Sequence, residues 1–182
     1  PAYPSIVASG PQACVLHYNA NNRRIGDGDL VLIDAGCELD GYASDITRTY
    51  PANGHFSDAQ RTLYELVLRA QSAAIAAVVP GRPYSAIHDA AVRVLTEGML
   101  DLGLLDANKV GTLDDAIAAR AYAQFYMHGT GHWLGMDVHD VGAYRDVTLP
   151  DKPSRPLLPG MALTVEPGIY VRPGEGVPER FW

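Results

Sequence analysis

The feature that most limits how this chain can fold is a pair of aspartates inside apolar, strand-like sequence. Asp34 ends the run DLVLID, and Asp45 lies in the run ASDITRTY. Far along the chain, the stretch MHGTGHWLGMDVHD carries three histidines within twelve residues, and Glu166 follows in an apolar segment. Because a buried carboxylate is costly unless its charge is compensated, we expect these segments to meet at one carboxylate-rich site for two metal ions.

Length and composition limit the class of protein. The 182 residues suffice for one domain with a real core, and 47% apolar with 19% charged residues is typical of a globular protein. A net charge of −7 with scattered lysines and arginines argues against nucleic acid or an anionic membrane as a partner. No apolar run reaches the length of a membrane span. Two cysteines are too few for a disulfide framework and favour a reducing, cytoplasmic location.

The order of apolar patterns predicts strands, then two helices, then strands. Residues 29–34 and 39–50 are expected to form neighbouring strands. A helix is expected over 57–80, from a capping box at its start to a Pro-Gly pair at its end, and a second over 85–103. From Phe125 onward the sequence is strand-like again. This order predicts an α+β domain in which helices cover a curved, mostly antiparallel sheet.

The two aspartates are eleven residues apart, an odd spacing that puts side chains on opposite faces of an uninterrupted strand. The Gly-bounded stretch 36–41 can turn the chain and let both carboxylates converge on one face. The alternative is that Asp34 caps a strand end while Asp45 forms a surface salt bridge with Arg48. Apolar residues around both aspartates favour the shared site.

The histidines do not match the zinc-binding helix motif. His128 and His132 are four apart, but a glutamate after the first is missing, and the glycines at 129 and 131 disfavour a helix. On an extended segment each can still be a ligand, since glycine permits close backbone approach. A single histidine in apolar sequence is more often a hydrogen-bonded core residue, an alternative that also holds for His17. Glu166 alone could equally face solvent from a half-exposed strand.

Four ordered motifs resemble those of the Xaa-Pro aminopeptidases, the aminopeptidase P group within the pita-bread metallopeptidases. They are Val15–Tyr18, DLVLIDAGCELDGYASDITRTYP, MHGTGHWLGMDVHDVG and PGMALTVEPGIY. The resemblance covers essentially all 182 residues and is closer to aminopeptidase P than to prolidase. It implies the pita-bread fold and removal of the first residue from peptides with proline in second position.

The resemblance also implies roles for individual residues. It implies four metal ligands, namely Asp34, Asp45, His132 and Glu166, with Asp45 as the bridge and Glu166 also as the base. It implies four side chains around the peptide: His17 and His139 beside the scissile bond, and His128 and Tyr170 in the substrate pocket. The expected cofactor is a pair of divalent ions, manganese with cobalt or zinc as alternatives, which suits mostly oxygen ligands.

Three other functions stay open at this point. A prolidase would cleave only Xaa-Pro dipeptides, whereas a methionine aminopeptidase fits the DITRTYP and MHGTGH stretches less well. A non-catalytic pita-bread interaction module, as in histone chaperones, or a metal-free relative such as creatinase is expected to have lost the carboxylate ligands. This chain retains Asp34, Asp45, His132 and Glu166.

The sequence also predicts that residues 1–182 are an incomplete catalytic domain. It has no initiator Met, and it ends at Phe181-Trp182 in an expected turn between strands. The family pattern has a fifth ligand, a glutamate two residues after an arginine on a closing strand, whereas Glu175 and Glu179 lie in Pro/Gly-rich sequence. An amino-terminal domain that drives homo-oligomer formation is also expected elsewhere. We therefore expect these 182 residues alone to bind metal weakly.

Overall fold

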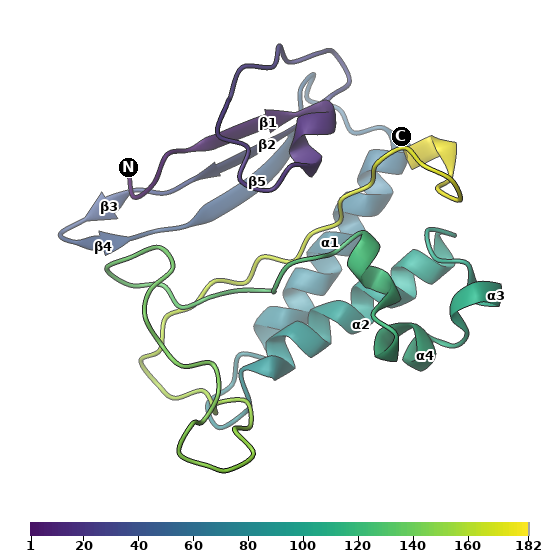
Figure 1. Cartoon of the computed structure of the whole chain (residues 1–182). Helices are drawn as coiled ribbons and strands as arrows, with labels where there is room; N and C mark the ends of the chain where they lie inside the picture. The colour runs from purple at the N-terminus through teal and green to yellow at the C-terminus, as the bar shows by residue number, and fades with distance from the viewer. Residues whose placement is uncertain (182) are drawn as a thin grey trace.

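Three strands from the first third of the chain form an antiparallel sheet in the computed structural model, which describes residues 1–181. Its order is β1 (Ile6–Ser9), β2 (Leu30–Ala35) and β5 (Ile46–Pro51), as Figure 1 shows. β5 alternates between exposed and half-buried residues, the pattern of a strand with one covered face. The predicted pairing of two neighbouring strands is confirmed, since β2 pairs with β5.

The stretch expected as one strand over 39–50 is instead a hairpin followed by a strand. β3 (Glu38–Leu39) pairs with β4 (Tyr42–Ala43) across a tight turn, and only then does β5 begin. Asp40 and Gly41 have φ values of 52° and 84°. This pair of left-handed residues is typical of the two-residue turns that match strand twist. The prediction of a continuous strand was therefore wrong, because Asp-Gly reverses the chain.

Two helices pack against each other and form most of the core. α1 (Asp58–Ala76) begins at Ser57 with the predicted capping box, and α2 (Ser85–Asp101) follows. α1 ends before the Pro-Gly pair, because the chain passes into tight turns after Ala76. A Cβ at Gly98 would lie 2.4 Å from a Leu66 methyl, so glycine allows the two helices to approach closely. The short helices α3 (Ala107–Val110) and α4 (Leu113–Ala118) come next.

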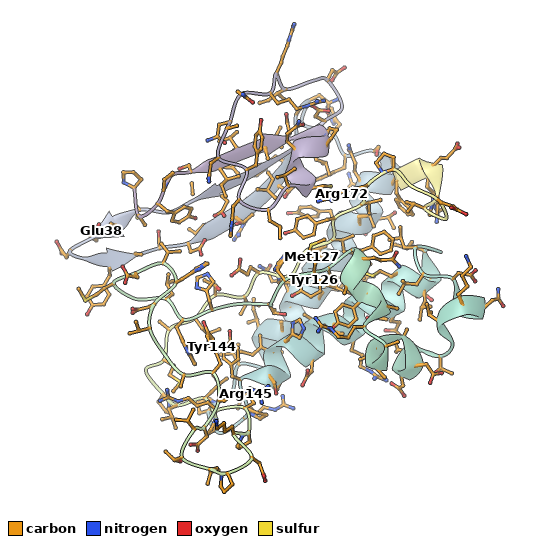
Figure 2. All side chains as sticks on the ribbon, in the orientation of Figure 1. Glu38, Tyr126, Met127, Tyr144, Arg145 and Arg172 are labelled. Atoms are coloured by element: carbon orange, nitrogen blue, oxygen red, sulfur yellow. The ribbon has the colours of Figure 1, made fainter. Side chains whose placement is uncertain are left out.

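The chain from Phe125 onward is extended but forms almost no regular strand. Residues 130–134 and 162–166 run antiparallel beside each other, with one ladder bridge between Trp133 and Leu163. They lie between the sheet and the helices (Figure 1), and Tyr126, labelled in Figure 2, anchors them in the helical core. The predicted extended character is confirmed, whereas regular strands are absent from the described residues after 125.

Three further findings bear on the sequence predictions. The short helical turn Glu179–Phe181 ends the described chain, and Trp182, part of the expected turn between strands, lies outside the described residues. Cys14 and Cys37 are free thiols. No helix within residues 1–181 is both long enough and apolar enough to cross a membrane.

Candidate metal centre

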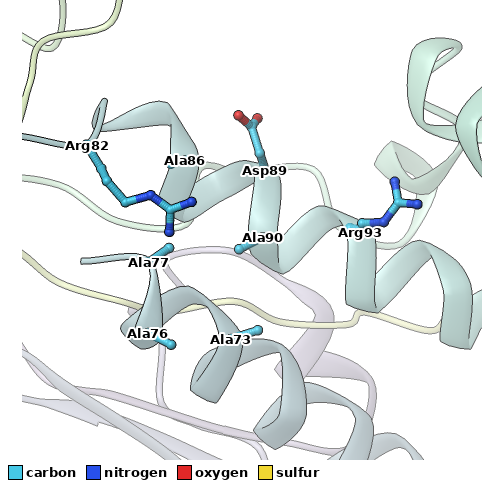
Figure 3. Close-up of a pocket in the computed structure, with 8 residues that line it drawn as sticks. All are labelled: Ala73, Ala76, Ala77, Arg82, Ala86, Asp89, Ala90 and Arg93. Carbon is cyan, nitrogen blue, oxygen red and sulfur yellow. The ribbon is translucent and has the colours of Figure 1, made fainter. Parts of the chain in front are cut away.

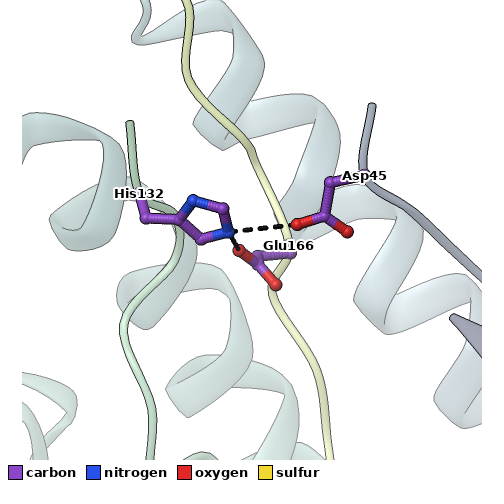
Figure 4. Close-up of side chains that lie close together, drawn as sticks. All are labelled: Asp45, His132 and Glu166. Atoms are coloured by element: carbon purple, nitrogen blue, oxygen red, sulfur yellow. Dashed lines mark hydrogen bonds and ion pairs between the residues drawn. The ribbon is translucent and has the colours of Figure 1, made fainter. Parts of the chain in front are cut away.

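Asp45, His132 and Glu166 meet although they are far apart in the sequence. One ligand atom from each lies within 4.8 Å of the others (Figure 4). The Nε2 atom of His132 is 3.1 Å from Asp45 Oδ2 and 3.2 Å from Glu166 Oε1. Three of the four predicted ligands thus surround one point. The alternative pairing of Asp45 with Arg48 is wrong, since Arg48 donates to the Thr47 carbonyl instead.

The fourth predicted ligand, Asp34, joins this cluster through a tyrosine hydroxyl. In the β2–β5 register Asp34 lies opposite Thr47, so Asp45, two residues before Thr47, shares its face. The hydroxyl of Tyr3 is 2.5 Å from Asp34 Oδ1 and 3.0 Å from Asp45 Oδ1. The turn between the aspartates therefore brings both carboxylates together, as the sequence predicted.

The hydroxyl of Tyr3 is held in its protonated form. Burial raises the pKa of Tyr3 far above its ordinary value, and the Asp34 and Asp45 carboxylates raise it further. A protonated phenol has one hydrogen to donate, so it stabilises one carboxylate at a time. Sequence reasoning missed Tyr3, which precedes the strands and has no ionisable neighbour along the chain that would single it out.

The His132–Glu166 half of the site depends on main-chain bonds between two extended segments. The N–H of Glu166 donates to the Thr130 carbonyl at 2.7 Å, and the N–H of Thr164 donates to the His132 carbonyl at 2.9 Å. A Cβ on Gly131 would lie only 2.0 Å from the Thr164 carbonyl oxygen. Glycine at 131 therefore permits the approach that places His132 beside Glu166.

A buried threonine links the two ligands of this half directly. The Oγ1 atom of Thr164 accepts the His132 N–H at 3.0 Å and donates to Glu166 Oε1 at 2.7 Å. Thr164 is a second residue that the sequence did not single out. Its signal was weak: it lies two residues before Glu166, on the same side of an extended segment.

The orientation of the His132 ring indicates that the cluster suits a cation. Its Nδ1 lies 2.9 Å from the Trp133 carbonyl oxygen, so Nδ1 carries the hydrogen and donates it there. The lone pair of the neutral ring is then at Nε2, which faces Asp45 and Glu166. A lone pair facing two carboxylates is stable only with a positive charge among them. An imidazole held by a carbonyl and flanked by carboxylates is the usual donor set for a divalent metal ion.

The four residues predicted around the substrate lie at different places. The His139 ring centre is 4.0 Å from that of His132, so this exposed imidazole borders the cluster. Nε2 of His128 lies 2.8 Å from the Tyr170 hydroxyl, and burial together with the nearby Glu166 carboxylate raises the pKa of Tyr170 to about 12. The side chain of His17 is exposed and has no hydrogen bond to the cluster within residues 1–181, so its role stays a prediction.

Two hollows lie near the extended segments and the helices. One, of about 550 Å³, is lined by Tyr84, His88, Tyr126 and His128 among others, and therefore adjoins the predicted substrate pocket. The second, of about 440 Å³, lies between α1 and α2 and is lined mainly by alanines with Arg82, Asp89 and Arg93 (Figure 3). None of the predicted site residues lines the second hollow.

Curated relatives contain a region similar to this sequence within longer chains. The chain is 55% identical over 181 residues to the Xaa-Pro aminopeptidase of Haemophilus influenzae and 48% identical to that of Escherichia coli. All of this chain is covered, but only 40% and 39% of those proteins. The chain thus spans about two fifths of the length of these relatives.

Solved structures agree with the predicted fold. Aminopeptidase PepP of Pseudomonas aeruginosa matches all of this chain and 39% of its own, with 56% identity and a TM-score of 0.93. A zinc-substituted E. coli aminopeptidase P in complex with product matches with 48% identity and a TM-score of 0.90, again over all of this chain and 39% of its own. The sequence profile of metallopeptidase family M24 matches residues 1–179. With its carboxylates and imidazole gathered at one point, the chain belongs to metallopeptidase family M24.

Proposed function

We propose that these residues form most of the metal centre of an Xaa-Pro aminopeptidase, which removes the first residue from peptides with proline in second position. The observation that carries the proposal is the convergence of Asp45, His132 and Glu166, with Asp34 one hydroxyl away. The Xaa-Pro aminopeptidases that match over the whole chain support the substrate class.

The donor set fits a pair of divalent cations. Asp34 and Asp45 would hold one ion, and Asp45, His132 and Glu166 would hold the other, so that Asp45 is shared. Mostly oxygen donors with one imidazole favour manganese among the metals of such sites. Bound cations of this kind supply Lewis-acid stabilisation of developing negative charge and activation of water. With four side chains for two ions, we expect weaker binding by these 182 residues than by a centre with further ligands.

Glu166 is the residue best placed to act as the base. Its Oε1 is fixed by the Thr164 hydroxyl at 2.7 Å, while the carboxylate remains about one-third exposed and so reachable by water. A positioned carboxylate of this kind accepts the proton of the attacking water and later returns it to the leaving amine. His139, whose ring centre lies 4.0 Å from that of His132, would donate to the oxygen of the scissile carbonyl.

The substrate proline would lie against His128 and Tyr170. The two rings meet edge to face with their centres 5.4 Å apart, and the hydrogen bond between them holds both in place. The hydrogen on Nδ1 of His128 is directed at the Gly129 carbonyl, 2.7 Å away, so Nε2 accepts the Tyr170 hydroxyl hydrogen. Their polar atoms are then satisfied, and the ring faces offer an apolar wall that suits a pyrrolidine ring.

Calorimetric titration with Mn²⁺ tests the metal centre. We expect Asp45→Asn to weaken binding at least roughly 10–100-fold, because removing the shared carboxylate affects both ions. Asp101→Asn is the matched control, since it removes the same charge from an exposed position at the end of α2. Equal affinity for wild type and Asp45→Asn would refute the assignment. Hydrolysis of Xaa-Pro tripeptides, compared with dipeptides, separates an aminopeptidase from a prolidase.

A further inference from the structure

Thr164 occupies a position between the two ligand-bearing segments that no other described hydroxyl shares. Its side chain contacts the main chain of His132 and the carboxylate of Glu166 at the same time, at 3.0 Å and 2.7 Å. The residue is 9% exposed, so water competes little for these bonds. Its own N–H donates to the His132 carbonyl at 2.9 Å. Thr164 thus bonds both main-chain polar groups of His132, its N–H and its carbonyl.

The direction of each hydrogen bond follows from the donors available. The main-chain N–H of His132 can only donate, so it occupies a lone pair of the Thr164 hydroxyl. The single hydroxyl hydrogen is then free to donate to Oε1 of Glu166. This bond fixes the rotation of the carboxylate about its last side-chain bond.

The local backbone explains why a side chain, and not a main-chain carbonyl, accepts the N–H of His132. In a regular antiparallel pair, the N–H of His132 would donate to the Thr164 carbonyl. Here the N–H donates to the Thr164 hydroxyl, while the Thr164 carbonyl approaches Gly131 so closely that a Cβ there would be 2.0 Å away. A β-branched side chain has restricted rotation, so its hydroxyl is a stiff replacement for a ladder acceptor.

We propose that Thr164 is the positioning residue of this metal centre, setting the carboxylate of Glu166 and the main chain of His132 through one hydroxyl. The proposal rests on the proposed function, because it concerns the same cluster. Hydrogen-bond partners of ligands usually change metal affinity when removed, by roughly 10–100-fold. The loss of this hydroxyl should therefore weaken metal binding, although Thr164 itself contacts no metal.

The first test is metal binding by Thr164→Val, which keeps the shape and removes the hydroxyl. We expect Mn²⁺ affinity roughly 10–100-fold below wild type, a changed visible absorption spectrum of the Co²⁺-loaded protein, and recovery of both in Thr164→Ser. Thr96→Val is the matched control: Thr96 is also buried, but its hydroxyl donates to the Val92 carbonyl within α2. It should bind Mn²⁺ like wild type.

The second test needs no metal. Amide hydrogen exchange at His132 should be faster in Thr164→Val than in wild type and Thr164→Ser, because its N–H has lost its acceptor. Should Thr164→Val not fold, Thr164→Ala serves in both measurements. Unchanged affinity, spectrum and exchange in a folded variant would overturn the positioning role while leaving the metal centre intact. Absence of metal binding by wild type would overturn the proposed function itself. The exchange rate at His132 would then test only the hydrogen bond from its N–H to the Thr164 hydroxyl.

Discussion

The two halves of the proposed metal centre are built in different ways. The aspartate half lies at the end of a regular ladder: β2 and β5 pair over six residues, with Asp34 inside the ladder and Asp45 one residue before β5, on the same face. The His132–Glu166 half lies on two extended segments with little regular pairing, where a threonine hydroxyl replaces a ladder acceptor. Regular main-chain pairing therefore supports the first half, whereas the second combines a few main-chain bonds with the Thr164 side chain.

Both halves nevertheless need a glycine where their segments approach most closely. A Cβ on Gly36 would lie 1.8 Å from the Ser44 carbonyl oxygen, and one on Gly131 would lie 2.0 Å from that of Thr164. Neither clash involves a flexible side chain that could move away. Gly131 directly precedes His132, whereas Gly36 lies two residues after Asp34 and approaches Ser44, which directly precedes Asp45. The same device therefore brings together both pairs of segments.

The largest expected effects come from adding a side chain at Gly36 or Gly131, where the paired segments approach most closely. Gly36→Ala and Gly131→Ala should each lower the free energy of unfolding by about 3 kcal/mol, the upper end of the cost of overpacking. Because the ladder resists displacement, we expect Gly36→Ala to cost more stability. Because the segments of the second half have little regular pairing and can shift apart, we expect Gly131→Ala to lose more Mn²⁺ affinity than Gly36→Ala. Chemical denaturation and calorimetric titration of both variants measure these quantities.

Gly174→Ala is the control for these two substitutions, since the nearest atom to its Cβ would be 3.9 Å away. It should be nearly neutral in both measurements. If Gly131→Ala lost stability but kept its full metal affinity, the second half would be as rigid as the first, and the contrast between them would fail.

Ionisable residues in apolar sequence could be identified from the sequence alone. Asp34, Asp45 and Glu166 stand out because a carboxylate seldom lies in such a segment without a partner. Tyr3 and Thr164 could not be identified, because tyrosine and threonine are ordinary in strand-like sequence. Their roles depend on a register between segments, such as the 31 positions that separate Tyr3 from Asp34, and local pattern does not specify that register.

The same reasoning explains which parts of the fold were predictable. The start of α1 at Ser57 followed from a capping box, whose bonds lie within one turn. The two-residue turn at Asp40 and Gly41 was missed, because strand-like residues on both sides favoured one continuous strand. The irregular pairing after Phe125 depends on the bond from His132 to a threonine side chain, which periodicity does not detect.

A smaller effect is expected from removing the hydroxyl that the two aspartates share. In the metal-free protein, Tyr3→Phe should lower the free energy of unfolding by about 1.5–3 kcal/mol, the usual contribution of a hydrogen bond to a charged group. With saturating Mn²⁺ the loss should be smaller, because a cation compensates the carboxylates in place of the hydroxyl.

Thermal or chemical unfolding of Tyr3→Phe with and without Mn²⁺ measures this difference. Because the loss of stability is smaller with Mn²⁺ bound, the Mn²⁺ affinity of Tyr3→Phe should be higher than that of wild type, in contrast to Thr164→Val. An affinity loss as large as that of Thr164→Val would show that the first half also depends on single side chains. Tyr18→Phe, which loses an exposed hydroxyl bonded to Asn22, is the control.

The smallest effect should be a pH dependence of stability that involves the second half alone. His88 on α2 lies 2.8 Å from the Thr130 hydroxyl, and burial lowers its pKa; Asp89 opposes this shift, while Arg120 and His128 add to it. In the unfolded chain the ring takes up a proton near pH 6.5, but in the folded protein it does so only at lower pH. The unfolded state therefore binds more protons in this window, and stability falls as the pH is lowered through it.

His88→Gln isolates this contribution, since glutamine retains hydrogen-bonding atoms but does not titrate. Between about pH 7.5 and about pH 5.5, the free energy of unfolding of wild type should fall more steeply than that of His88→Gln. His55→Gln, at an exposed position before α1, should keep the wild-type slope. Equal slopes for wild type and His88→Gln would mean that the contact between α2 and Thr130 does not discriminate against the charged ring. His88 would then contribute no pH dependence to the stability of the second half. The predicted response of this half to substitution would depend on Thr164 and Gly131 alone.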